Sequence, residues 1–127
     1  MERTPNDAKN FSLIKRAKSF VHAGRGIWIF LKTTHNAWIH VVAFVLAIAL
    51  GFYFGISHIE WIILILVGGV VLAAEAFNTA IEIDIDLTSP EYHPYARDTK
   101  DVAAAAVLIS AITALVVGIL IFGQYLF

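Results

Sequence analysis

The sequence predicts an all-α integral membrane protein, built from an N-terminal amphipathic surface helix and three transmembrane helices. The chain of 127 residues is 59% hydrophobic, with a mean hydropathy of +0.76, well above the apolar share of a soluble domain. Three segments are apolar over about 20 residues, the length that crosses the hydrocarbon core of a bilayer. Because this length suits a single domain, residues 1–127 are expected to form one membrane domain.

The composition also excludes several classes of function. Since the chain has no cysteine, disulfides, thiolate nucleophiles and cysteine-based zinc sites are ruled out. The formal net charge of −1 argues against a nucleic-acid binder that works by bulk electrostatics. The first 36 residues are basic and polar, without the short apolar core of a signal peptide. We therefore expect an uncleaved, multi-pass membrane protein.

Residues 10–33 are predicted to form an amphipathic helix. Apolar residues share one face at a spacing of about 3.6 residues: Leu13, Ala17, Phe20, Gly24, Ile27, Trp28 and Leu31. The other face carries Lys15, Lys18, His22 and Arg25. A basic amphipathic helix suits the anionic cytoplasmic leaflet of a membrane, although a helix packed on the bundle would show the same pattern.

The three predicted transmembrane helices cover residues 37–56, 61–83 and 102–122. The first contains His40, which is expected to be an interface histidine with satisfied hydrogen bonds, although contact with a headgroup or nucleotide is an alternative. The second is apolar until Glu75, and the third carries Ser110 and Thr113 as its polar residues. An ionisable group such as Glu75 is costly within such a segment and usually has a function.

The basic residues predict the orientation of the chain. The nine lysines and arginines lie either before the first transmembrane segment or, as Arg97 and Lys100, in the connector of residues 84–101. The connector of residues 57–60 has none. The positive-inside rule then places the N-terminus and the longer connector in the cytoplasm.

A stripe of polar side chains ends the second transmembrane segment. At about 100° per residue, Glu75, Asn78, Glu82 and Asp86 fall within about 80° of one helix face, and Asp84 points to the opposite side. A central Asp costs about 2.5–3.5 kcal/mol on membrane-insertion scales. The stripe is therefore expected to face protein, water, metal or substrate rather than lipid.

These residue types are the parts of a phosphoryl-transfer site. Glu82 and Asp86, four residues apart, offer the oxygen ligands that Mg²⁺ prefers. Glu75 lies deepest in the membrane and fits a general base that takes the proton of a hydroxyl. Lys100, beside Asp101 at the start of the third segment, could neutralise the charge of a phosphate.

Each part also has a structural interpretation. Asn78 could be a hydrogen-bonding residue between helices. Glu82 and Asp86 could end a helix in solvent, and Lys100 with Asp101 could simply start one. Glu75 differs, because a carboxylate within an apolar segment has few structural uses.

The polar stripe and its surroundings resemble a known family. The pattern Glu75-x-x-Asn78-Thr79-Ala80-Ile81-Glu82-x-x-x-Asp86 closely resembles the signature of the prokaryotic diacylglycerol kinase family, which consists of small integral-membrane lipid kinases. The resemblance continues through residues 89–94 and 100–108 and reaches upstream to Gly26. The Ser-Pro-Glu-Tyr-His-Pro segment at residues 89–94 resembles the Gram-positive branch, whose members act mainly on undecaprenol.

The resemblance implies a reaction, a site and an assembly. It implies ATP- and Mg²⁺-dependent phosphorylation of a lipid alcohol in the bacterial cytoplasmic membrane, with undecaprenol as the first candidate and diacylglycerol as the second. Glu75 is the implied base that activates the lipid hydroxyl, and Glu82 is the implied ligand of Mg²⁺. Further implied substrate- or ATP-binding residues are Asn78, Asp86, Lys100 and Asp101. The family also implies a homotrimer with active sites between neighbouring subunits.

One position departs from the family pattern. Eight residues after Gly26, where the family usually carries a second metal-binding glutamate, this chain has Thr34. Residues 8–59 contain no acidic residue that could take the place of this glutamate. Thr34 could bind Mg²⁺ through its hydroxyl or a water, or Asp84 or Asp86 could compensate. The alternative is a weakly active or inactive lipid-binding homologue.

Overall fold

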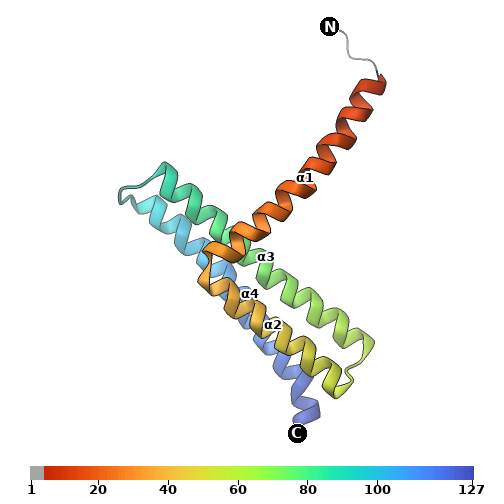
Figure 1. Ribbon diagram of the computed structural model, residues 1–127. Helices are drawn as coiled ribbons and strands as arrows, with labels where there is room; N and C mark the ends of the chain where they lie inside the picture. The colour runs from red at the N-terminus through yellow and green to blue at the C-terminus, as the bar shows by residue number, and fades with distance from the viewer. Residues whose placement is uncertain (1–4) are drawn as a thin grey trace. The chain divides into compact units, whose positions relative to one another are not determined.

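The computed structural model describes residues 5–127, with side chains described from residue 12 onward, and consists of four α-helices in this range (Figure 1). The helices are α1 (Pro5–Thr33), α2 (His35–Phe54), α3 (His58–Thr88) and α4 (Pro94–Leu126). α2, α3 and α4 are each long and apolar enough to cross a membrane. The predicted all-α membrane fold class is confirmed, whereas the homotrimer stays a prediction.

α1 is a compact unit by itself, and the chain from Thr34 onward forms a second unit. The described part of α1 exposes several large apolar side chains, among them Phe20, Ile27 and Trp28. Two of its hydroxyl groups bond within the helix, since Ser19 Oγ and Thr33 Oγ1 each donate to the backbone carbonyl of the residue four positions earlier. Such a helix leaves its apolar residues available for a membrane surface or another partner.

The second unit is a bundle in which α3 and α4 run side by side in opposite directions (Figure 1). In this bundle α2 packs mainly on α3. Its buried apolar cluster lies toward one end and consists of Ile56, Leu64, Ile121 and Phe122. Most other large apolar side chains of the three helices are exposed. Exposed apolar side chains are expected on helices whose surroundings are lipid rather than water.

The turn between α2 and α3 is defined by local chemistry. Gly55 adopts the left-handed conformation with φ of 62° and ends α2, which is a position where glycine carries no Cβ penalty. Ser57 then starts α3 with a reciprocal capping box, because its hydroxyl accepts from the Glu60 backbone N–H and the Glu60 carboxylate accepts from the Ser57 N–H. The same carboxylate accepts hydrogen bonds from Gln124 and Tyr125 near the end of α4. These bonds hold α3 and α4 together at this end of the bundle.

Two helices extend beyond the apolar segments that the sequence defines. α3 continues to Thr88, past the predicted end at residue 83, so the whole polar stripe is helical. α4 begins at Pro94, where His93 Nδ1 accepts from the backbone N–H of Tyr95. Lys100 and the residues near it therefore lie inside α4 rather than at its start. A length rule based on hydropathy measures only the apolar part of a helix, whereas backbone hydrogen bonding continues into the polar residues.

Candidate active site

Glu75 is the most deeply buried member of the polar stripe. Only 2% of its surface is exposed, and its Oε1 lies 3.3 Å from Nε2 of His40 on α2. The other carboxylate oxygen, Oε2, is buried and has no hydrogen-bond partner among the described residues. A buried carboxylate oxygen without a donor is costly, so this atom is suited to accept a hydrogen bond from a substrate.

Thr79, one turn after Glu75, links α3 to the start of α2. Its hydroxyl lies 2.8 Å from the hydroxyl of Thr34, within hydrogen-bond distance, and only 8% of Thr79 is exposed. Thr34 is the N-cap residue of α2, yet its side chain makes no capping bond. The Thr34 hydroxyl would usually cap α2 from this position, but here it contacts Thr79 on α3 instead.

Asn78 and Glu82 form the next pair along the stripe. Asn78 Nδ2 donates to Glu82 Oε1 at 3.3 Å. Asn78 Oδ1 is buried without a partner among the described residues, whereas Glu82 is exposed. The amide nitrogen of Asn78 thus faces the exposed carboxylate of Glu82, and that carboxylate is an oxygen ligand of the kind that Mg²⁺ takes together with substrate phosphates. Glu82 therefore fits the ion that the resemblance implies.

The last pair joins α3 to α4. Lys100 Nζ forms an ion pair with Asp86 Oδ1, and Asp86 is exposed. Asp101 is also exposed and forms no ion pair with any residue that the structure describes. Lys100 is therefore close to the polar stripe, but its charge is already balanced by a carboxylate.

The stripe is thus one face of α3 that passes from buried to exposed. Glu75 and Thr79 are buried, Asn78 is half-buried, and Glu82 and Asp86 are exposed. Two contacts are consistent with the predicted common face. Asn78 donates to Glu82 on the same helix, and Asp86 pairs with Lys100 on α4. Among the side chains that the structure describes, from residue 12 onward, no three histidine, aspartate or glutamate residues come close enough together to hold a metal ion. An ion at Glu82 would need further ligands from ATP or from another subunit.

Asp84 lies outside this arrangement. It is exposed, and its backbone carbonyl accepts from the Thr88 hydroxyl. No ion pair links its side chain to the described residues. The structure gives no contact through which Asp84 would replace the glutamate that is missing at position 34.

Two contacts of the site could not be identified from the sequence: His40 with Glu75 and Thr34 with Thr79. A signal for the first was present, because an ionisable residue within a membrane segment usually has a polar partner. His40 is the histidine of the first predicted segment. Which turn of one helix faces which turn of the other cannot be read from either segment alone.

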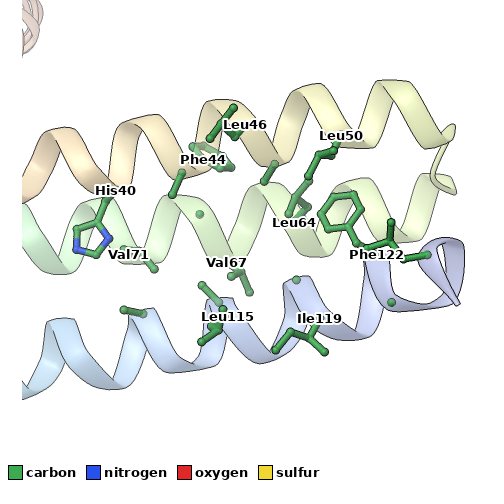
Figure 2. Close-up of a pocket in the computed structure, with 18 of the residues that line it drawn as sticks. His40, Phe44, Leu46, Leu50, Leu64, Val67, Val71, Leu115, Ile119 and Phe122 are labelled. Atoms are coloured by element: carbon green, nitrogen blue, oxygen red, sulfur yellow. The ribbon is translucent and has the colours of Figure 1, made fainter.

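An apolar cavity of about 600 Å³ lies between α2, α3 and α4. Figure 2 shows His40 at one end of it and Phe122 toward the other. Among the residues that line it, His40 is the polar side chain and the rest are aliphatic, aromatic or glycine. Glu75 does not line the cavity, so His40 is the residue that contacts both the cavity and the buried carboxylate.

Comparison with known proteins places these features in context. The family described as Prokaryotic diacylglycerol kinase matches residues 21–122. An undecaprenol kinase of Bacillus subtilis is 44% identical over 105 residues, which cover 83% of this chain and 85% of the relative. A diacylglycerol kinase of Helicobacter pylori is 32% identical over 124 residues, covering 92% and 94%. A diacylglycerol kinase of Escherichia coli is 33% identical over 92 residues, covering 67% and 75%.

Proposed function

This chain belongs to the prokaryotic diacylglycerol kinase family and is a lipid kinase, and on this basis we propose that it phosphorylates undecaprenol with ATP and Mg²⁺. Diacylglycerol is the second candidate acceptor. The undecaprenol kinase of Bacillus subtilis, at 44% identity, favours the first substrate over the second, since the diacylglycerol kinases named above are 32% and 33% identical.

We place the protein in the bacterial cytoplasmic membrane with its N-terminus in the cytoplasm. The support is the distribution of lysine and arginine, which lie before α2 and around the α3–α4 connection. In this orientation the exposed end of the polar stripe, at Glu82 and Asp86, faces the compartment that holds ATP. Glu75 lies deeper, where the hydroxyl of a membrane lipid would reach it.

The observation that carries the proposal is the buried carboxylate of Glu75 with its unpartnered Oε2. A lipid hydroxyl that donates a hydrogen bond to Oε2 would be positioned for proton transfer. In the reaction, the hydroxyl oxygen bonds to the γ-phosphorus of ATP, and the bond from that phosphorus to the bridging oxygen of ADP breaks. The hydroxyl proton passes to Glu75.

Other residues of the stripe would act on the nucleotide. Glu82 would hold Mg²⁺, which when bound neutralises negative charge on the phosphates, and Asn78, which donates to Glu82, would lie at the substrate site. Lys100 would exchange its ion pair with Asp86 for a contact with phosphate, and Asp101 would lie at the nucleotide site. Phosphoryl transfer needs mainly such positioning and charge stabilisation.

We also propose that the active protein is a homotrimer whose sites lie between subunits, as the family implies. The support in this chain is that Glu82, Asp86 and Asp101 are exposed and that the described residues of one chain do not by themselves surround a metal ion. A second subunit would enclose the rest of the metal site.

A kinase assay across a panel of lipid alcohols tests the proposed reaction. Purified protein in vesicles would receive labelled ATP with undecaprenol, diacylglycerol or a long-chain alkanol, each with and without Mg²⁺. We expect labelled lipid phosphate with undecaprenol, less with diacylglycerol, and none without Mg²⁺. Equal labelling of all three alcohols would contradict the proposed substrate, and labelling without Mg²⁺ would contradict the proposed cofactor.

One observation favours a second candidate function, a lipid-binding homologue with little or no kinase activity. Thr34 occupies the position of the family's second metal-binding glutamate, and its hydroxyl lies within hydrogen-bond distance of that of Thr79. Titration of the purified protein with ATP, with and without Mg²⁺, separates the two. Mg²⁺-dependent binding supports the kinase, and its absence supports the homologue without activity.

A further inference from the structure

The two oxygens of the Glu75 carboxylate have different surroundings. His40 Nε2 lies 3.3 Å from Oε1, whereas Oε2 has no partner among the described residues. When Glu75 is ionised, Nε2 has to carry the hydrogen of this contact, because two facing acceptors would repel. His40 thereby fixes the rotation of the carboxylate and leaves one defined oxygen available.

The surroundings of the pair give His40 a large effect on that rotation. Glu75 is almost fully buried, and a buried carboxylate gains more from a hydrogen bond than an exposed one. His40 and Glu75 come from different helices, α2 and α3, so the contact also fixes the carboxylate relative to α2. Without a donor at His40, neither oxygen of Glu75 would have a partner among the described residues, and no contact with α2 would fix the rotation of the carboxylate.

We propose that His40 is a positioning residue for the kinase reaction: its Nε2–H holds Oε1 of Glu75 so that Oε2 receives the proton of the lipid hydroxyl. This inference rests on the proposed function, since it takes Glu75 as the base. His40 itself does not exchange a proton with the substrate in this account. Its contribution is to the rate of the chemical step and not to the binding of ATP.

The geometry supplies a matched set of variants. Glutamine places its side-chain N–H₂ near the position of histidine Nε2, whereas asparagine is shorter by one methylene and does not reach Glu75. Leucine at His40 removes the donor and is apolar like the other residues that line the cavity, so it preserves the cavity wall. His58, an exposed histidine that begins α3 at the other end of the bundle, provides the control through His58→Leu.

The experiment measures kcat and the KM for ATP of each variant in vesicles, alongside Glu75→Gln. We expect kcat to fall by about tenfold or more in His40→Asn and His40→Leu, because a hydrogen bond to a charged group accounts for about that factor. We expect His40→Gln to keep kcat within about threefold of the parent, and all of these variants to keep an unchanged KM for ATP. The control His58→Leu should match the parent.

Two results would overturn the role of His40. One is a parent-like kcat in His40→Leu and His40→Asn while Glu75→Gln is inactive, which would refute the role of His40 and leave the proposed function intact. The other is an equal loss in all three His40 variants with a raised KM for ATP, which would show that His40 serves the fold. Normal turnover of Glu75→Gln would instead refute the base itself. Circular dichroism of each variant verifies that the helices are formed.

Discussion

The hydroxyl groups of Thr34 and Thr79 lie 2.8 Å apart and join the first residue before α2 to a buried turn of α3. Thr79 lies four residues after Glu75 and three before Glu82, so it is a neighbour of both on the helix surface. A side chain at position 34 is therefore directed at the middle of the polar stripe. Because of this contact, substitutions at position 34 can test what the presence of Thr34 in place of the family's glutamate does to metal binding.

Restoring an acid at this position should strengthen metal binding. We expect Thr34→Glu to lower the Mg²⁺ concentration needed for half-maximal kinase activity by about tenfold, since even indirect partners of a metal change its affinity by 10–100-fold. The isosteric change Thr34→Val, which adds no ligand, is the control. An unchanged Mg²⁺ requirement in Thr34→Glu would show that position 34 does not reach the metal in this protein.

Lys100 should act on the nucleotide rather than on the lipid. We expect Lys100→Met to raise the KM for ATP by about tenfold, because the variant lacks the cation that would face phosphate. The KM for the lipid alcohol should not change. Arg97, which lies in the same part of α4 but is paired with Asp98 and Tyr92, provides the matched control through Arg97→Met. Steady-state kinetics with each substrate varied in turn measures both constants.

The same kinetic measurements distinguish the role of Asp86 from that of Lys100. If its main role is the ion pair, Asp86→Asn leaves the lysine free for phosphate, and we expect a smaller change in the KM for ATP than in Lys100→Met. A larger effect of Asp86→Asn than of Lys100→Met would mean that Asp86 contacts the nucleotide or its ion directly.

The close approach of α2 to α3 depends on Gly68. A Cβ at this position would lie 2.2 Å from the ring of Phe44, so Gly68→Ala requires the ring or the helices to move. We expect a loss of about 1–3 kcal/mol in stability, the usual cost of overpacking, seen as a lower midpoint of thermal unfolding in detergent micelles. The neighbouring Gly69 has nothing within 4 Å of the corresponding position. Gly69→Ala should therefore leave the midpoint unchanged or raise it, and equal effects of the two substitutions would contradict this account.

The sequence was sufficient to predict the fold class because hydropathy and length determine which segments can cross a membrane. The helix ends were predicted less well, as Thr88 and Pro94 show, since polar residues continue a helix without contributing to hydropathy. The common face of Glu75, Asn78 and Glu82 followed from periodicity alone. That face belongs to a single helix, so no knowledge of packing was required.

Contacts between helices could not be predicted in the same way. The pairing of His40 with Glu75 depends on how α2 and α3 are aligned along their lengths, and this alignment is determined by packing such as that of Phe44 on Gly68. Segment boundaries that are uncertain by a few residues change which side chains face each other. For the same reason, the sequence alone could not identify Thr79 as the partner of Thr34.

The most direct test of the account is the turnover of Glu75→Gln in vesicles with undecaprenol, labelled ATP and Mg²⁺. Glutamine retains the size of the side chain but cannot accept the hydroxyl proton, so we expect labelled lipid phosphate to fall by about 100-fold or more while Mg²⁺-dependent ATP binding stays at the parent level. Turnover close to that of the parent chain would contradict the assignment of the buried carboxylate as the base of this lipid kinase.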